Sequence, residues 1–260
     1  MYASVTKRIT EVKQPRGGYI KPKEFTEIKV DDGKVLFEKE NINPTNVGMA
    51  VDYLTRHMMG GIPLEAFGIP AMGAAEAEKC GKSTVKEFES ILEKVNGLTD
   101  ESIIAVCRLT SYDVWFRNKG AALASNWTNQ VIPDENTISN IRIMVERAID
   151  FFGKYGPIVE SGFTFEPDGY TATVFTGDGD YLTIDTIWDF KVSKKPLTNK
   201  QTLQLAMYYI MGKHSGKDVY LTTKNIGIFN PRLNIIYTLD MSTISDEIIK
   251  TIERDVICYE

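Results

Sequence analysis

The sequence predicts an α/β fold, in which a central mixed β-sheet is flanked by helices within one domain over residues 1–260. Three observations support this fold class. The chain has 260 residues, of which 43% are hydrophobic and 25% charged, and these values are typical of a globular domain. Helical periodicity dominates before about residue 155 and returns near residue 199, and short strand-like segments lie between. No stretch has the composition of a linker.

The first half of the chain is predicted to be mainly helical. In residues 45–59, Val47, Val51, Leu54 and Met58 recur every three or four positions and form one apolar stripe. Similar stripes predict helices over 83–95, over 101–110 and from about 135 to 152. Two other segments have different patterns: residues 19–40 predict a β-hairpin, and 60–82 predict an irregular connection with a short helix near 74–78.

The second half is predicted to hold the sheet. Short apolar segments separated by Gly, Pro and Asp predict strands over 162–166, 170–175, 181–185 and 187–192. A helix is expected next over 199–211, ended by Gly212. Two more strands follow over 216–228 and 233–238, and a helix over 245–254 closes the chain.

Composition narrows the class of protein. The formal net charge is −5, so binding of nucleic acid by bulk positive charge is not expected. If the chain binds nucleic acid, a local site must do so, and a metal ion there could supply positive charge. Cys80, Cys107 and Cys258 are far apart, which argues against a disulfide framework or a zinc knuckle. No apolar run is long enough to span a bilayer, and no secretory signal begins the sequence. We therefore expect a cytoplasmic protein without membrane contact.

The segment 187–192 carries the most informative polar residues. Side chains on a strand alternate between faces, so Trp188 and Phe190 share one face while Asp189 and Lys191 share the other. Asp180 begins the preceding strand, and a hairpin between the two strands would bring it across from the segment that holds Asp189. Two carboxylates and a backbone carbonyl suit Mg²⁺ or Mn²⁺. A lysine beside them could orient a water molecule or stabilise developing negative charge on a phosphate.

The following helix presents two stripes. One stripe is polar and suited to contacts with a nucleic-acid backbone; it consists of Gln201, Gln204 and Tyr208. The opposite stripe is apolar and suited to packing on the sheet; it consists of Leu203, Met207 and Ile210. The aromatic residues Trp115, Phe116 and Trp127 are expected to contribute to packing and not to base stacking.

Taken together, Gly177-x-x-Asp180, Asp189-x-Lys191 and Gln204-x-x-x-Tyr208 resemble the PD-(D/E)XK nuclease superfamily, in particular its RecB-like exonuclease branch. The resemblance covers about residues 160–212. It implies a restriction-endonuclease-like αβββαβ core that cleaves DNA with Mg²⁺ or Mn²⁺. It also implies that Asp180 and Asp189 bind the metal, that Lys191 is catalytic, and that Gln204 and Tyr208 position the substrate, with Gln201 on the same stripe.

Further metal ligands implied by the resemblance are left open. In the family, a histidine on an N-terminal helix often contributes to the metal site, and here Asp52 occupies that place, four residues after Gly48. The helix-borne acid that relatives place upstream of the glycine motif could be Glu146 or Glu160. Several relatives hold an iron–sulfur cluster with four cysteines, so three scattered cysteines predict that this chain holds none.

The function expected from these observations is metal-dependent hydrolysis of DNA phosphodiester bonds by an exonuclease that acts on linear ends or single strands. With no helicase motif in the sequence, unwinding would come from a helicase or other protein partner. The main alternative is a nuclease fold with a degraded site that serves as a nucleic-acid-binding or assembly module. A third is an enzyme of the same fold that acts on RNA or in host defence.

Overall fold

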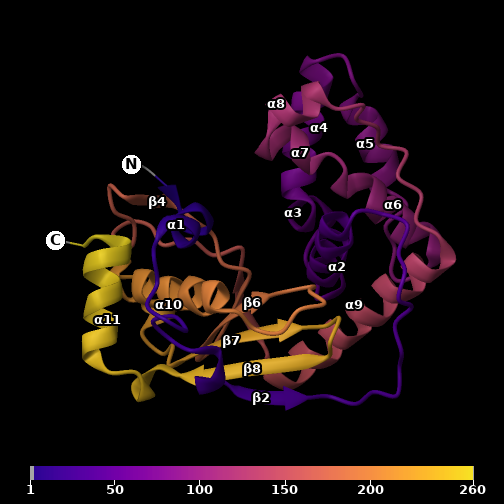
Figure 1. Cartoon of the computed structure of the whole chain (residues 1–260). Helices are drawn as coiled ribbons and strands as arrows, with labels where there is room; N and C mark the ends of the chain where they lie inside the picture. The colour runs from indigo at the N-terminus through magenta and orange to yellow at the C-terminus, as the bar shows by residue number, and fades with distance from the viewer. Residues whose placement is uncertain (1–2, 260) are drawn as a thin grey trace. The chain divides into compact units, whose positions relative to one another are not determined.

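The computed structural model describes residues 3–259, and its contacts group into two compact units (Figure 1). The chain before Asp32 and the chain from Phe151 onward form one unit, which contains the six-stranded sheet and is called the sheet unit below. Residues Asp32–Asp150 form the other, called the helical unit. One domain over the whole length remains a prediction.

The helical unit is built from short helices joined by turns. Its helices are α2 (Pro44–Met58), α3 (Pro63–Ala66), α4 (Gly68–Lys79), α5 (Val85–Leu92), α6 (Asp100–Thr110), α7 (Asp113–Arg117), α8 (Lys119–Ala124) and most of α9 (Glu135–Tyr155). Side-chain caps begin several of them, because a hydroxyl oxygen can accept one of the unbonded N–H groups of the first turn. Thr84 caps α5 in this way and Thr99 caps α6. The predicted helices over 45–59, 83–95 and 101–110 are confirmed.

The sheet unit contains the remaining elements. Its strands are β1 (Ala3–Ser4), β2 (Thr26–Lys29), β3 (Ile158–Ser161), β4 (Val174–Thr176), β5 (Tyr181–Thr183), β6 (Thr186–Phe190), β7 (Asn225–Asn230) and β8 (Ile235–Asp240). Its α-helices are α1 (Val5–Glu11), α10 (Asn199–His214) and α11 (Asp246–Ile252), and its shorter turns of helix are Pro22–Glu24, Asp218–Tyr220, Met241–Thr243 and Glu253–Ile257.

The large sheet has the strand order β2-β8-β7-β6-β5-β3. Strands β6 and β7 run parallel and are connected through α10, and the other neighbouring pairs are antiparallel. A parallel pair needs such a crossover, because a short hairpin joins only antiparallel strands. Strands β1 and β4 form a separate parallel pair. The coarse prediction of an α/β fold with a mixed sheet flanked by helices is therefore confirmed.

Both faces of the sheet are covered. On one face, Leu182 and Ile187 belong to a continuous apolar core with Leu203 and Met207 of α10. On the other face, the ring of Phe151 stacks on Phe229 with centroids 4.3 Å apart and meets the edge of Trp188 at 4.8 Å. The alternation predicted for 187–192 is thus confirmed, because Trp188 points away from the core that contains α10.

Several predicted boundaries are wrong, and each has a physical reason. Residues 19–40 form no hairpin, because β2 pairs with the distant strand β8. Residues 162–166 are not a strand: Phe163 and Phe165 are buried against Tyr208 and Tyr220 instead of entering the ladder.

Two further predictions are wrong: that a helix ends at Gly212, and that residues 60–82 form an irregular connection. Helix α10 continues through Gly212, where an added Cβ would lie 2.7 Å from the ring of Tyr220, so this glycine permits close packing and does not end the helix. The segment 60–82 is mostly helical, as α3 and α4.

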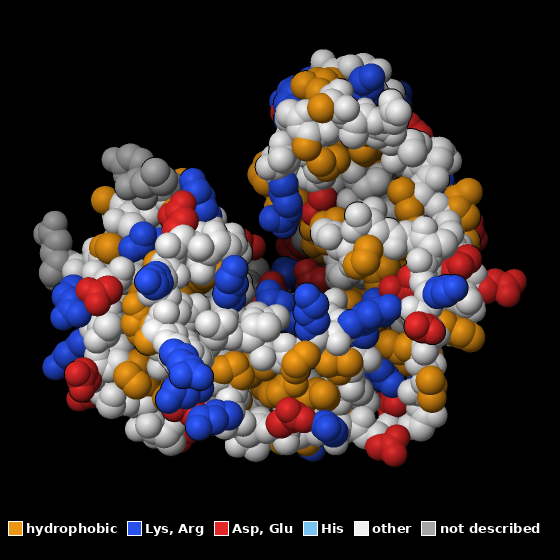
Figure 2. Space-filling model, in the orientation of Figure 1, with side chains coloured by type: hydrophobic (Ala, Val, Ile, Leu, Met, Phe, Trp, Pro, Cys, Tyr) orange, Lys and Arg blue, Asp and Glu red, His pale blue; other side chains and the backbone are white. Residues whose placement is uncertain are grey.

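The surface carries mixed charge. On the face shown in Figure 2, Lys and Arg side chains are interspersed with Asp and Glu side chains over the sheet unit, as the small net charge implies. Among residues 3–259, no helix combines the length and the apolarity that crossing a membrane requires.

Candidate functional site

The candidate site lies on the sheet unit, where strands β5 and β6 meet. The two strands are antiparallel, with Tyr181 paired with Trp188 and Leu182 paired with Ile187. The same register continued by one residue places Asp180 opposite Asp189. The Asp180 carboxylate also accepts a hydrogen bond from the backbone N–H of Phe190, with 2.7 Å between Oδ2 and N. The predicted hairpin pairing is therefore confirmed.

Two glycines hold the turn that precedes Asp180. A Cβ added to Gly179 would lie 1.9 Å from the ring of Phe163, and one added to Gly177 would lie 2.6 Å from Cγ2 of Val5. The Gly179 N–H donates to the carbonyl oxygen of Phe163 over 2.9 Å. The chain can follow this path only without side chains at these positions, so the glycines before Asp180 fix where its carboxylate lies.

Asp189 and Lys191 form a close ion pair. The Nζ atom of Lys191 lies 2.9 Å from each carboxylate oxygen of Asp189. The aspartate side chain is only 2% exposed, whereas the lysine side chain is 30% exposed. A carboxylate buried to this extent is costly unless a cation compensates it. Lys191 provides that charge from the side that faces solvent.

Helix α10 contributes the two residues of its predicted polar motif. Gln204 donates a hydrogen bond from Nε2 to the hydroxyl oxygen of Tyr208 over 2.8 Å, and both side chains are buried. Burial raises the pKa of Tyr208 well above its usual value, and the negative charges of Asp189 and Asp180 raise this pKa further. Tyr208 therefore keeps its hydroxyl hydrogen, and both carboxylates lie within electrostatic range of it.

Gln201 has a different local role from its neighbours on the polar stripe. Its Oε1 atom accepts hydrogen bonds from the backbone N–H and the hydroxyl of Thr198, each over 2.9 Å. Thr198 in turn accepts from the N–H of Gln201, so the pair forms a capping box at the start of α10. The side chain thus stabilises the first turn of the helix that carries Gln204 and Tyr208. Substrate contact by Gln201 remains a prediction.

The structure gives the remaining predicted metal ligands other contacts. Glu160 is on β3, next to Leu182 of β5, and its charge contributes to a raised pKa of Tyr220, for which burial is the larger cause. Asp52 and Glu146 belong to the helical unit. There, Asp52 pairs with Arg56 at 3.1 Å and Glu146 pairs with Lys34 at 2.8 Å.

The cluster on the sheet unit therefore brings together Asp180, Asp189, Lys191, Gln204 and Tyr208. Over residues 3–259, no group of three or more His, Cys, Asp or Glu side chains is arranged to hold a metal ion. The two aspartates nevertheless supply oxygen ligands of the kind that Mg²⁺ and Mn²⁺ prefer. Metal binding at any of the predicted ligands stays a prediction.

One acidic residue near the cluster was missed in the sequence. The charge of Asp178 also contributes to the raised pKa of Tyr208, after burial and the two aspartates named above. Its position between Gly177 and Gly179 could have identified it, because a turn that delivers Asp180 to the site carries its neighbour there too.

Comparisons of the chain with models of protein families, with curated proteins and with solved structures find no match.

Proposed function

We propose that the protein is a metal-dependent DNA nuclease of the RecB-like type that hydrolyses phosphodiester bonds. The observation that carries the proposal is the register of β5 and β6, which continued by one residue puts Asp180 opposite Asp189, together with the Lys191 ammonium 2.9 Å from Asp189. Two carboxylates and a lysine in one place match the residue types that phosphodiester hydrolysis requires. The proposed substrates are linear DNA ends or single strands, and a helicase or other partner would supply unwinding.

The order of elements in the sheet unit supports the proposal. The elements α9, β3, β5, β6, α10 and β7 follow one another in the chain, apart from the short strand β4. This order corresponds to the αβββαβ core that the resemblance implies. Lys191 follows directly on β6, and Gln204 and Tyr208 lie on the next helix, α10, as the resemblance implies for the glutamine and tyrosine.

The donor set fits a hard divalent cation. Asp180 and Asp189 are the residues that would hold Mg²⁺ or Mn²⁺, which when bound would polarise a phosphate oxygen and lower the pKa of a water molecule. The backbone N–H of Phe190 keeps the Asp180 carboxylate oriented towards the end of β6. Lys191 balances the buried charge of Asp189 and can give a hydrogen bond to a phosphate oxygen or to the attacking water.

Tyr208 and Gln204 orient the substrate in this proposal. The raised pKa of Tyr208 keeps its phenol neutral, so its hydroxyl can donate to a phosphate oxygen. Gln204 fixes the direction of that hydroxyl, because its amide already donates to the phenolic oxygen. Positioning of this kind lowers the barrier by holding the reacting phosphate in place before the reaction.

The test is degradation of end-labelled single- and double-stranded linear DNA in the presence of Mg²⁺ or Mn²⁺. The native chain is compared with Lys191→Ala, and Lys195→Ala serves as the matched control, because Lys195 is an exposed lysine of the same segment. The proposal expects metal-dependent cleavage by the native chain and the control, and none by Lys191→Ala. Cleavage that persists in Lys191→Ala, or no cleavage by any of the three proteins, would overturn it.

A second candidate function is a nucleic-acid-binding or assembly module with a degraded nuclease site. The observation that favours it is the ion pair of Asp52, whose two carboxylate oxygens both face the guanidinium of Arg56. Such a module would bind DNA without a divalent ion, and the affinity would fall as salt rises. Measuring DNA binding in chelator at several salt concentrations separates the two functions.

A further inference from the structure

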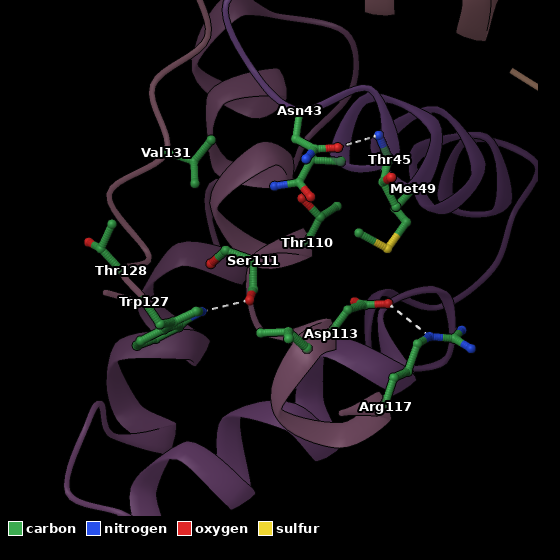
Figure 3. A pocket seen from close by; sticks show the side chains of 12 residues that line it. Asn43, Thr45, Met49, Thr110, Ser111, Asp113, Arg117, Trp127, Thr128 and Val131 are labelled. Carbon is green, nitrogen blue, oxygen red and sulfur yellow. Dashed lines mark hydrogen bonds and ion pairs between the residues drawn. The ribbon is translucent and has the colours of Figure 1, made fainter. Parts of the chain in front are cut away.

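The helical unit contains a cavity of about 480 Å³ that belongs to no part of the candidate nuclease site (Figure 3). It lies between the start of α2, the end of α6, helix α7 and the segment 127–131. Its size is in the range of pockets that hold small organic molecules. Apolar and polar side chains both line it, so its preferred ligand depends on which polar atoms are left without partners.

Asp113, at the start of α7, is the key polar residue of this cavity. Its side chain is almost fully buried. The Oδ2 atom accepts a hydrogen bond from the hydroxyl of Tyr53 over 2.6 Å and lies 3.3 Å from Nε of Arg117. The Oδ1 atom is also buried, and over residues 3–259 it has no hydrogen-bond partner. A buried carboxylate oxygen without a partner in the protein is rare, and a donor from outside the chain can satisfy it.

Charge around Asp113 restricts what that donor is. Burial raises the pKa of Asp113 to about 6, so near pH 7 the group is mainly an ionised acceptor. An anionic ligand would be repelled by the carboxylate. A cationic ligand would meet the positive charge of Arg117, which already faces the same carboxylate. A neutral N–H donor fits best, because it satisfies the oxygen without adding a charge.

The walls of the cavity favour a flat ring. The indole N–H of Trp127 donates to the carbonyl oxygen of Ser111 over 2.7 Å, which fixes the ring at one wall (Figure 3). The rings of Tyr112 and Trp115 support it edge-on, with centroids 5.1 and 5.6 Å away. Trp127 was expected to serve packing alone, but it also lines the cavity. A rigid aromatic wall is suited to stacking with a planar ligand.

Other side chains supply the remaining contacts. The sulfur of Met49 points towards the middle of the group of side chains in Figure 3, and the amide of Asn46 also lines the cavity. A thioether adapts to a ring of variable outline, and an amide can both donate and accept a hydrogen bond. Acceptor, amide, thioether and aromatic wall together match a heterocyclic base that bears an amino group.

We propose that this cavity binds a nucleobase with an exocyclic amino group, which donates a hydrogen bond to Oδ1 of Asp113. The base is either that of a free nucleoside or one within a single strand, because both present the same ring and amino group. The proposal does not rest on the nuclease function, since the cavity lies wholly in the helical unit.

The test is titration calorimetry with matched pairs of ligands. Deoxycytidine and deoxyadenosine carry the amino group, whereas deoxyuridine and deoxyinosine replace it with a carbonyl oxygen. The amino compounds are expected to bind at least about tenfold more tightly, because a carbonyl oxygen facing Oδ1 cannot donate. A short deoxycytidine strand and a deoxyuridine strand form the second arm. Tighter binding of the amino compounds as free nucleosides identifies a small-molecule site. Tighter binding of the deoxycytidine strand alone identifies a site for single-stranded DNA.

Two variants locate the binding. Asp113→Asn presents an amide to the ligand, so the preference for deoxycytidine over deoxyuridine should be lost or reversed, and thermal unfolding checks that this variant folds. Met49→Trp fills the cavity without removing a buried hydrogen bond and should abolish binding of every ligand. Equal affinity for deoxycytidine and deoxyuridine in both arms, no binding in either arm, or binding that both variants leave unchanged would overturn the proposal.

Discussion

The two units each bury an aspartate, but the two carboxylates have different surroundings. Asp189 of the sheet unit faces the ammonium of Lys191, which lies 2.9 Å from each of its oxygens. Asp113 of the helical unit receives a neutral hydroxyl and a guanidinium on one oxygen, and over residues 3–259 its other oxygen has no hydrogen-bond partner. The residue type and its burial are therefore the same, and the groups that face the carboxylate make the difference.

The comparison shows that the groups facing a buried carboxylate indicate which kind of ligand it can bind. A carboxylate whose charge is balanced by a nearby lysine can exchange part of that interaction for a metal ion, because both partners are cations. A carboxylate with one satisfied and one unsatisfied oxygen instead calls for a neutral donor. We therefore propose metal chemistry for Asp189 and recognition of an amino group for Asp113.

The largest effect is expected from Asp189→Asn. Loss of the carboxylate charge removes a proposed metal ligand, and we expect DNA cleavage to fall by about a thousandfold, since a metal ion contributes several kcal/mol and each tenfold corresponds to about 1.4 kcal/mol. Cleavage rates on end-labelled DNA with Mn²⁺ measure this effect. Asp168→Asn, an exposed aspartate of the same unit, is the control and should cleave normally. Equal rates for the two variants would remove Asp189 from the mechanism.

Lys191→Met sharpens the comparison through stability. The substitution leaves Asp189 buried without its ammonium, and breaking such a pair costs about 3–5 kcal/mol in the interior and less here because the lysine is partly exposed. Urea unfolding without metal should show a lower free energy of unfolding than the native chain. Mn²⁺ should then raise the stability of this variant more than that of the native chain, since the ion replaces the missing cation. A variant as stable as the native chain would show that Lys191 does not compensate Asp189.

Asp113→Asn should change how stability depends on pH. The pKa of Asp113 is about 6 in the folded chain against 3.8 ordinarily, so the folded state holds its proton up to a higher pH. Between these values the folded state binds more protons than the unfolded state, and the free energy of unfolding falls as pH rises, by about 3 kcal/mol in all at 1.36 kcal/mol per pH unit. Asparagine does not titrate, so the variant should lack this fall.

Unfolding curves of both proteins between pH 4 and 7 measure that difference. The groups that act on the titration of Asp113 are Tyr53, Arg117 and Asp52, and all of them remain in the variant. The variant should gain stability relative to the native chain as pH rises through this range. A constant difference between the two curves would show that Asp113 is not the titrating group.

The smallest effect is expected at the turn before Asp180. In Gly179→Ala the new Cβ would lie 1.9 Å from the ring of Phe163, so the buried ring or the turn must shift, at a cost of about 1–3 kcal/mol. Gly153→Ala is the matched control, because this glycine is inside α9 with open space around it. Alanine favours helix there, and we expect a gain of about 0.5–1 kcal/mol. If Gly153→Ala is destabilised by a similar amount, the replacement of glycine itself, and not the contact with Phe163, lowers the stability of Gly179→Ala.

Local pattern explains most of what could be predicted from the sequence. The stripe of Val47, Val51 and Leu54 predicts α2 because helix periodicity depends only on neighbouring residues. The pairing of Asp180 with Asp189 was also predictable, because a short turn joins β5 directly to β6. The strands predicted over 181–185 and 187–192 therefore differ from the structure only at their ends.

Features that depend on distant parts of the chain could not be predicted. Strand β2 pairs with β8, which lies about two hundred residues later in the chain, and nothing in residues 19–40 indicates this partner. Gly212 looks like a helix end until the ring of Tyr220 is placed against it. The cavity beside Asp113 is formed by four separate segments, so the sequence gives no sign that an oxygen of this aspartate would lack a partner.

Titration calorimetry of the native chain, Asp189→Asn and Asp113→Asn tests the division of roles most directly. Each protein is titrated once with Mn²⁺ and once with deoxycytidine, and a titration with deoxyuridine is the reference for the preference. The account predicts that Asp189→Asn loses Mn²⁺ binding and keeps deoxycytidine, whereas Asp113→Asn keeps Mn²⁺ and loses its preference for deoxycytidine. Loss of Mn²⁺ binding in Asp113→Asn with retention in Asp189→Asn, or no binding of either ligand by the native chain, would contradict it.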